Sequence, residues 1–222
     1  MWQLPSAVGA PKAQELLGVG ADLAPETMLA GYRSGLFPMN VQLPDDSDAL
    51  GWWSPNPRGV LPPGKVRISR SLRRSIRRYR VTVDRRFDEV VAHCGDPRRP
   101  HGWITDDFRE AYSVLFALGW AHSIEVWNDD HELAGGLFGI SLGGLFAAES
   151  KFHLQTDASK VAVVALCRIM SSGDHGSTRL IDVQWSTPHL ASLGVEELSR
   201  NAYLDLLPLL LRTPAPTFRY DG

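Results

Sequence analysis

The hydrophobic pattern is most regular between residues 122 and 152, where it predicts three consecutive strands. Residues 122–127 (HSIEVW) alternate with a period of two, which is typical of a half-buried strand. Asp129-Asp130 then predicts a turn, and the stretch 135–152 (GGLFGISLGGLFAAESKF) follows, with glycines set among apolar residues. Glycines inside strands indicate that the backbone bends or is closely approached. We therefore expect a three-stranded meander over 122–152.

Apolar residues at helical spacing predict helices on both sides of the meander. Pro25 suits the first position of a helix, because its missing N–H needs no partner there. Ser69 is a candidate N-cap, and Pro208 should kink the last helix or end it early. The predicted helices span residues 25–32, 70–79, 87–93, 105–118, 157–171 and 196–211.

Strands are also expected at 80–84 and 179–184. Helices and strands then alternate around a mixed sheet, so the predicted fold class is α+β. The N-terminal part is instead loop-rich and aromatic, and Pro62-Pro63-Gly64 is the best candidate for a linker. We expect a small N-terminal domain over residues 1–62 and a larger catalytic domain over 63–222.

Composition fits a soluble globular protein of 222 residues, with 44% hydrophobic and 22% charged residues. Cys94 and Cys167 are too few for a disulfide scaffold or a zinc cluster, and Cys167 falls in an apolar helical run, which suits a reducing compartment. No run approaches the ~18 apolar residues of a membrane span. The N-terminus also lacks a basic-then-apolar signal pattern. We therefore expect a cytoplasmic protein without a membrane partner.

Charge is unevenly distributed, although the formal net charge is only −2. Between residues 65 and 86 there are ten basic residues and one acid, Asp84. A solvated helix face with buried side-chain stems is the simplest interpretation of such a run. The scarcity of acids here favours contact with a nucleic-acid backbone instead. The arginines that we expect to make this contact are Arg70, Arg73, Arg74, Arg77 and Arg78.

Polar residues near the ends of apolar strands are the candidates for chemistry. Asp182 and Gln184 are two apart in LIDVQ (180–184), so period two places both on one strand face. The two side chains either form hydrogen bonds with backbone amides of nearby loops or converge on a ligand. Polar groups are costly in an apolar strand, so the second interpretation is favoured. Glu149 is either an exposed strand end or a partner for a substrate amine. Together these residues predict an apolar pocket with polar side chains at its base.

Several common sites are not indicated. The motifs GxxxxGK[ST] and GxSxG are absent, which argues against a phosphate-binding loop and a hydrolase elbow. The seven histidines show neither HExxH nor CxxC spacing, so no metal site is expected. Trp103 follows a flexible loop and is a candidate stacking platform for a base, or else a core aromatic.

A set of motifs in fixed order resembles the leucyl/phenylalanyl-tRNA–protein transferases. The motifs are GVGADLAPETMLAGYRSGLFPM, WWSPNPRGVL, ISRSLRR, WITDDFREAY, GWAHSIEVW, ELAGGLFG, LFAAESKF, ASKVAV, LIDVQ and HLASLG, and the resemblance runs from about residue 17 to 207. It implies a GNAT-like acyltransferase domain, with a mixed sheet flanked by helices, and a small N-terminal α/β domain. It also implies transfer of Leu or Phe from aminoacyl-tRNA (Leu-tRNA, Phe-tRNA) to the N-terminal amine of a protein or peptide that begins with Arg or Lys. The product then carries an N-degron for degradation under the N-end rule. The resemblance implies no metal, CoA or other cofactor, and nothing in the sequence demands a dimer, so we expect a monomer.

The resemblance further implies roles for single residues. At the reactive centre, the side-chain oxygen of Gln184 would hold the acceptor amine, while Asp182 orients the glutamine and Glu149 lies by the donor's α-amine or terminal ribose. The Leu/Phe side-chain pocket would be lined by Leu137, Phe146 and Leu166. The 3′-adenosine would meet Tyr32, Met39 and Tyr112 and stack on Trp103.

The sequence departs from the family pattern at Met39, Asn56, Ala148, Lys151 and Leu166, where Ala148 replaces Gly and Leu166 stands where an aromatic is often seen. Met39 stands where the family usually has Trp, so a sulfur–aromatic contact would replace one half of an adenine sandwich. Lys151 replaces an apolar residue after Ser150.

Two other functions would also use parts of this sequence. A CoA-dependent N-acetyltransferase of the same fold needs a glycine-rich loop for the pyrophosphate, but residues 152–158 (FHLQTDA) contain no glycine. A non-catalytic tRNA-binding module would have no need of a polar pair beside a shaped apolar pocket.

Overall fold

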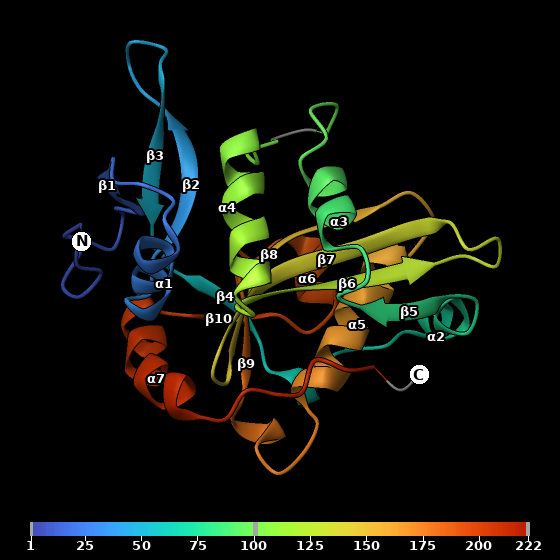
Figure 1. Ribbon diagram of the computed structural model, residues 1–222. Helices are drawn as coiled ribbons and strands as arrows, with labels where there is room; N and C mark the ends of the chain where they lie inside the picture. The colour runs from blue at the N-terminus through green and yellow to red at the C-terminus, as the bar shows by residue number, and fades with distance from the viewer. Residues whose placement is uncertain (1, 100–101, 221–222) are drawn as a thin grey trace.

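Two sheets organise the chain in the structure, a computed structural model that describes residues 2–99 and 102–220 (Figure 1). The smaller sheet is antiparallel, with the strand order β1-β3-β2. Its strands are β1 (Leu16–Val19), β2 (Phe37–Gln42) and β3 (Asp48–Trp53). This sheet and helix α1 (Pro25–Arg33) form a small N-terminal unit beside the larger sheet.

The larger sheet has seven strands in the order β10-β4-β9-β8-β7-β6-β5. Its strands are β4 (Arg58–Leu61), β5 (Arg80–Val83), β6 (Ala121–Trp127), β7 (Leu133–Leu142), β8 (Leu145–His153), β9 (Leu180–Gln184) and β10 (Glu196–Leu198). The predicted meander is confirmed as β6-β7-β8. A Cβ at Gly139 would collide with the carbonyl oxygen of Ala147, so the close approach expected of these glycines is found.

One pair of neighbouring strands in the larger sheet, β8 and β9, is parallel. Parallel neighbours need a long crossover connection, and helix α5 (Ala158–Met170) provides it. Helix α5 is buried over most of its surface and packs on one face of the sheet. Helices α3 (Phe87–Cys94) and α4 (Asp106–Ala117) pack on the other face. The predicted class, an α+β fold with a mixed sheet flanked by helices, is therefore confirmed.

The remaining helices are short or peripheral. They are α2 (Arg70–Ile76), α6 (Pro188–Ser192) and α7 (Arg200–Arg212), with single turns of 3₁₀ helix at Pro63–Lys65 and Gly176–Thr178. The cap predicted for α2 is confirmed, because the Ser69 hydroxyl accepts a hydrogen bond from Leu72 N at 3.1 Å.

The C-terminal helix differs from the expected one at both ends. Residues 196–198 pair with β4 as a strand, and Ser199 caps a helix that begins only at Arg200. The helix continues past Pro208 to Arg212, one residue beyond the expected end, so of the two expected effects of Pro208 an early end is excluded. Buried Leu207 and Leu210 lie on either side of the proline, and their packing offsets the lost backbone hydrogen bond.

The segment before the candidate linker belongs to the larger sheet, since β4 pairs with both β9 and β10. A division of the chain into domains at residue 62 stays a prediction. The pairing nevertheless brings Arg58 beside the strand that carries Asp182 and Gln184, and so positions the site described below.

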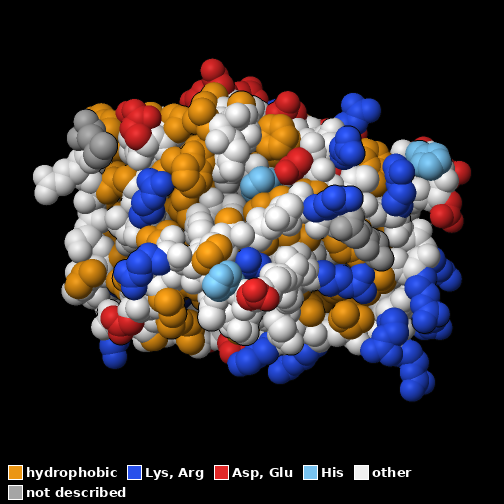
Figure 2. Space-filling model, turned by 60° about the horizontal axis from the view of Figure 1, so that its bottom comes forward, with side chains coloured by type: hydrophobic (Ala, Val, Ile, Leu, Met, Phe, Trp, Pro, Cys, Tyr) orange, Lys and Arg blue, Asp and Glu red, His pale blue; other side chains and the backbone are white. Residues whose placement is uncertain are grey.

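The surface of α2 carries the arginines singled out in the sequence. All five are exposed, and none forms an ion pair within the part of the chain that the structure describes: Arg70, Arg73, Arg74, Arg77 and Arg78. Figure 2 shows Lys and Arg side chains concentrated toward the right-hand end of the molecule, the side on which Figure 1 places α2. The exposed face of α2 is therefore cationic, and none of its five arginines is ion-paired among the described residues.

Candidate active site

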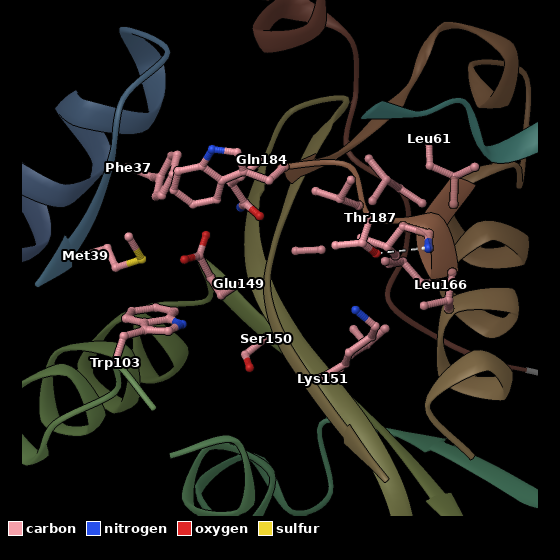
Figure 3. A pocket seen from close by; sticks show the side chains of 17 residues that line it. Phe37, Met39, Leu61, Trp103, Glu149, Ser150, Lys151, Leu166, Gln184 and Thr187 are labelled. Carbon is pink, nitrogen blue, oxygen red and sulfur yellow. Dashed lines mark hydrogen bonds between the residues drawn. The ribbon is translucent and has the colours of Figure 1, made fainter. Parts of the chain in front are cut away.

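A cavity of about 320 Å³ lies where β8 and β9 meet the N-terminal unit (Figure 3). Aromatic and sulfur-containing side chains form one end, and aliphatic side chains form the other. The aromatic end includes Phe37, Met39, Trp103 and Trp185, and the aliphatic end includes Leu61, Leu137, Val163, Leu166, Ile181 and Leu190. Glu149 and Gln184 lie between the two ends. The cavity thus joins apolar walls to a carboxyl and an amide.

Asp182 lies behind this cavity and does not line it. Its side chain is only 1% exposed, and both oxygens are fully engaged. Arg58 donates two hydrogen bonds, from Nε to Oδ1 at 2.9 Å and from Nη2 to Oδ2 at 2.6 Å. The Tyr203 hydroxyl donates to Oδ2 and the Gln184 backbone N–H to Oδ1, each at 2.9 Å. A buried ion pair of this kind is stabilised by its geometry and by the satisfaction of its remaining atoms.

Arg58 is as enclosed as its partner. Its third nitrogen, Nη1, donates to the Gly35 carbonyl at 3.0 Å, and the guanidinium lies over the rings of Tyr203 and Phe37. Burial, the largest single influence, lowers the pKa of Arg58, but the charge and hydrogen bonds of Asp182 together with the neighbouring Tyr203 and Glu149 raise it, and the net shift is upward. Burial also raises the pKa of Tyr203. Arg58 is therefore a charged donor to Asp182, and Tyr203 is a neutral one.

Gln184 lines the cavity because the backbone turns at its position. Ile181 and Val183 face the cavity, so strict alternation would place Asp182 and Gln184 together on the opposite face. Gln184 instead has a φ of +59°, in the left-handed region, and its side chain rejoins the cavity. The expectation that Asp182 and Gln184 share one face was therefore wrong, although the two remain joined by a hydrogen bond.

The Gln184 amide is held by the backbone around it. With its nitrogen turned toward two carbonyls, it donates to Val183 O at 2.9 Å and to Ala148 O at 3.0 Å. This orientation, assigned from the surrounding acceptors, exchanges oxygen and nitrogen relative to Figure 3. The side chain is consequently fixed at the point where the two ends of the cavity meet.

Glu149 is buried and only partly satisfied. One oxygen, Oε2, accepts a hydrogen bond from the Tyr112 hydroxyl at 2.9 Å, and the Tyr32 hydroxyl lies 3.4 Å beyond Tyr112. The other oxygen, Oε1, has no partner within the described residues. Burial raises the pKa of Glu149 to about 8, against the lowering effect of the hydrogen bond from Tyr112. A raised pKa together with a free oxygen is typical of a functional carboxyl.

The residues that the resemblance assigned to substrate divide into two groups. Four line the cavity: Met39, Trp103, Leu137 and Leu166. The three others lie behind its walls, where Tyr32 and Tyr112 are fully buried with Glu149 and Phe146 packs in the core with Leu137. The expected direct contacts of Tyr32 and Tyr112 with an adenosine, and of Phe146 with a side chain in the pocket, are not supported by these positions.

Several residues of the site were missed in the sequence. Arg58 and Tyr203 hold Asp182, while Phe37, Trp185 and Thr187 line the cavity. Arg58 lies in the motif WWSPNPRGVL, and its charge at the start of an apolar strand is a sequence signal for a buried ion pair. Tyr203 lies in an ordinary amphipathic helix, where nothing distinguishes it from a core residue.

The described part of the chain brings together no group of three or more His, Cys, Asp or Glu side chains that could hold a metal ion. Both cysteines are free and buried. Among residues 2–99 and 102–220, we find no helix with the length and apolar content to cross a bilayer.

A mixed α+β fold whose cavity joins apolar walls to a buried carboxyl and an amide is typical of an enzyme that binds an organic substrate. Comparison with known proteins makes the class specific. Residues 60–208 match the family model for leucyl/phenylalanyl-tRNA protein transferase, and residues 21–56 match the model for its N-terminal domain. The chain therefore belongs to the leucyl/phenylalanyl-tRNA–protein transferase family.

Individual relatives agree with the family models. A leucyl/phenylalanyl-tRNA–protein transferase from Tolumonas auensis is 45% identical over 205 residues, which cover 90% of this chain and 84% of the relative. One from Maridesulfovibrio salexigens is 43% identical over 205 residues, covering 90% and 82%. Among solved structures, L-PGS from Bacillus licheniformis matches with a TM-score of 0.35 and 12% identity over 76% of this chain and 55% of its own, a likeness too low to carry an inference.

Proposed function

We propose that this protein transfers leucine or phenylalanine from aminoacyl-tRNA to the N-terminal amine of a protein. The observation that carries the proposal is the cavity, in which an aliphatic pocket and an aromatic wall meet at Glu149 and Gln184. The aliphatic end suits a branched or aromatic side chain, and the aromatic end suits a nucleobase. The exposed arginines of α2 suit the phosphates of the same donor.

The donor would span the cavity from one end to the other. Its adenine would lie between Met39 and Trp103, and its amino-acid side chain against Leu137 and Leu166. An apolar pocket selects mainly by size and rejects charged side chains, because a charge that loses its water there has no partner. The ester carbonyl would then lie near Gln184.

The reaction is aminolysis of an ester, so an amide bond forms and the bond from the carbonyl carbon to the ribose 3′ oxygen breaks. The acceptor amine gives up a proton, and the departing 3′ oxygen gains one. With its nitrogen donating to Val183 and Ala148, Gln184 has its side-chain oxygen to accept a hydrogen bond from the attacking amine. Since the ester is already activated, holding amine and carbonyl in contact supplies most of the catalysis in this proposal.

Asp182 acts through Gln184 rather than on the substrate. It accepts the backbone N–H of Gln184 and is itself held by Arg58 and Tyr203, so it stabilises the turn that points Gln184 into the cavity. Glu149 is placed to bind the donor's α-amine through its free oxygen. A bound ammonium would lower the pKa of Glu149 and favour the carboxylate.

Finer statements are part of the same proposal. The family resemblance supports acceptors that begin with Arg or Lys, and a product that is degraded under the N-end rule. The two buried free cysteines fit a reducing cytoplasm, and we propose that the protein acts there as a monomer.

A CoA-dependent acetyltransferase is not favoured. The helix that would receive the pyrophosphate is α5, and its N-cap residue is Asp157. The Asp157 carboxylate accepts hydrogen bonds from Ser75 and Lys160 at that end. A carboxylate in this position repels a pyrophosphate.

The direct test is transfer of label. The protein is incubated with labelled leucyl-tRNA and a peptide that begins with Arg, and labelled peptide is expected. A panel of peptides that differ only in residue one then tests the acceptor. Label that moves only from acetyl-CoA would overturn the proposal.

A further inference from the structure

Lys151 on β8 places an ammonium at the aliphatic end of the cavity. Its partner across the sheet is Leu137 on β7, and side chains that pair across an antiparallel ladder point to the same face. Leu137 packs in the core cluster of α5, so Lys151 is directed to the wall that carries Leu166. Figure 3 shows Lys151 among the side chains of the cavity, on the side of Thr187 and Leu166.

A β-bulge separates this ammonium from the carboxyl of the site. The register of β7 and β8 shifts between Phe138 and Gly139, and the extra residue on β8 is Glu149. The Glu149 carboxyl bonds to the Tyr112 hydroxyl of α4, on the face of the sheet opposite α5. Glu149 and Lys151 consequently form no ion pair, although one residue lies between them in the sequence.

The Lys151 ammonium is left without a partner in the described part of the chain. It forms no hydrogen bond or ion pair there, and the cation–aromatic contacts of the same residues all involve arginines. Burial lowers the pKa of Lys151, which is the expected effect when an ammonium loses water without gaining a counter-charge. The aliphatic end thus holds a cation whose missing contact comes from water or from a bound substrate.

Two requirements define the side chain that fits this end. The walls are mainly hydrocarbon, so a polar group from the substrate would lose its water over most of its surface. The ammonium in turn requires electron density from the same side chain, and a branched aliphatic group supplies none. An aromatic ring meets both requirements, because its surface is apolar and its faces carry the negative part of the ring quadrupole. The walls are formed by Leu61, Leu137, Val163, Leu166, Ile181 and Leu190.

We propose that Lys151 makes phenylalanine the preferred donor residue over leucine, by placing its ammonium against the face of the phenyl ring. The inference rests on the proposed function, in which Leu or Phe occupies this end of the cavity. With leucine bound, hydrocarbon covers the ammonium and no group replaces its lost water. With phenylalanine bound, the ring replaces that water. A glutamate side chain would also match the charge, but its carboxylate would form an ion pair among aliphatic side chains, where the cost of desolvation offsets the attraction.

The first test is the ratio of kcat/KM for phenylalanyl-tRNA to kcat/KM for leucyl-tRNA, with one peptide acceptor. For the wild type we expect phenylalanyl-tRNA to be the better donor. In Lys151→Met, which keeps a long unbranched side chain, the ratio should fall about tenfold, as expected for the loss of a desolvated cation–π contact. Lys151→Arg keeps a cation and should keep the preference. The matched control is Lys12→Met, at an exposed position outside the cavity lining, which should leave the ratio unchanged.

A second test separates the charge of Lys151 from the shape of the pocket. Fluorine atoms on a phenyl ring withdraw electron density from its faces with little change in size, so they weaken contact with a cation. With tRNA that carries phenylalanine or its mono-, di- and trifluorinated forms, kcat/KM of the wild type should fall with each added fluorine. In Lys151→Met it should stay level. The wild-type series does not depend on the folding of any variant.

The outcomes separate this inference from the function beneath it. Wild-type preference for leucine, or a level response to fluorination, would overturn the inference and leave the proposed function standing, since transfer still occurs. A loss in Lys151→Met that is equal for both donors would overturn it as well and make Lys151 a wall of the pocket. Better transfer from glutamyl-tRNA than from phenylalanyl-tRNA would make the position a carboxylate site instead. No transfer from any of these donors would remove the proposed function itself.

Discussion

The two carboxyl groups of the site have opposite surroundings. Asp182 accepts four hydrogen bonds, two of them from a buried guanidinium, and lines no cavity. Among the described residues, Glu149 accepts one hydrogen bond, from Tyr112, and its other oxygen has no partner; the side chain lines the cavity. Burial raises the pKa of Glu149 to about 8. Asp182 is therefore part of the folded framework, whereas Glu149 keeps unused binding capacity for a ligand.

The largest expected effect is on Asp182. In Asp182→Asn the guanidinium of Arg58 loses its counter-charge inside the protein, which typically costs about 3–5 kcal/mol of folding free energy. Urea unfolding should show this loss. The matched change, Glu149→Gln, should cost far less, because it removes a carboxyl that forms no ion pair. A Glu149→Gln protein less stable than Asp182→Asn would break the comparison.

Activity should also reflect the role of Asp182 as part of the folded framework. In Asp182→Asn, measured at a temperature where the variant is folded, kcat should fall while tRNA binding persists, because Gln184 loses its support and the donor contacts do not. Wild-type turnover in this variant would contradict the positioning role of Asp182.

A second effect concerns pH. The pKa of Glu149 is raised on folding, from an ordinary value of 4.5 to about 8, so protonation favours the folded state. Its contribution to stability is complete below pH 4.5 and is lost as the pH rises through 8, with a slope of at most about 1.4 kcal/mol per pH unit. The difference in unfolding free energy between the wild type and Glu149→Gln should therefore change across this window. A difference that stays constant would show that Glu149 titrates normally.

A third effect separates the cavity wall from the framework. Trp103 packs edge-on against Phe108 and Tyr112 and presents its ring to the cavity. Trp103→Ala should raise KM for aminoacyl-tRNA about tenfold, since stacking on a base contributes about 1–3 kcal/mol. Trp103→Phe keeps a ring and should recover part of the loss, whereas the exposed Trp2→Ala should leave KM unchanged. Equal KM values for the Ala and Phe variants would argue against stacking.

The smallest expected effect comes from substituting the exposed arginines of α2. Replacing Arg73, Arg74 and Arg77 by Ala should raise KM for tRNA and reduce its dependence on salt, with little change in kcat or stability, because these side chains are exposed and unpaired. A control that removes the same charge elsewhere replaces Lys12, Arg33 and Arg212. Equal salt dependence in the two triple variants would remove α2 from the path of the tRNA.

Local pattern was enough to predict most elements of the larger sheet and the helices on its faces. Period two identified β6, and glycines among apolar residues identified β7 and β8, because these signals depend on neighbours in sequence. Ser69 was recognised as a cap for the same reason. The start of α7 was misjudged, because residues 196–198 pair with β4 as a strand, and pairing with a distant strand leaves no local signal.

The candidate site was predicted as a set of residues but not as an arrangement. Alternation placed Asp182 and Gln184 together, and a single left-handed residue separated them. The hydrogen bonds between Tyr112 and Glu149 and between Arg58 and Asp182 join residues far apart in the chain. Hydrophobic periodicity along the sequence carries no information about such long-range contacts. Only the resemblance to a family of transferases brought these positions into one hypothesis.

The pairing of Arg58 with Asp182 has a consequence for how the molecule is made. The two residues are 124 positions apart, so during synthesis the arginine emerges from the ribosome long before its counterion exists. Strand β4 has no partner for its charge until β9 has been translated, and it must remain hydrated until then. A nascent chain that stops short of β9 consequently has neither the strand that joins β4 to β8 nor the turn that directs Gln184 toward substrate.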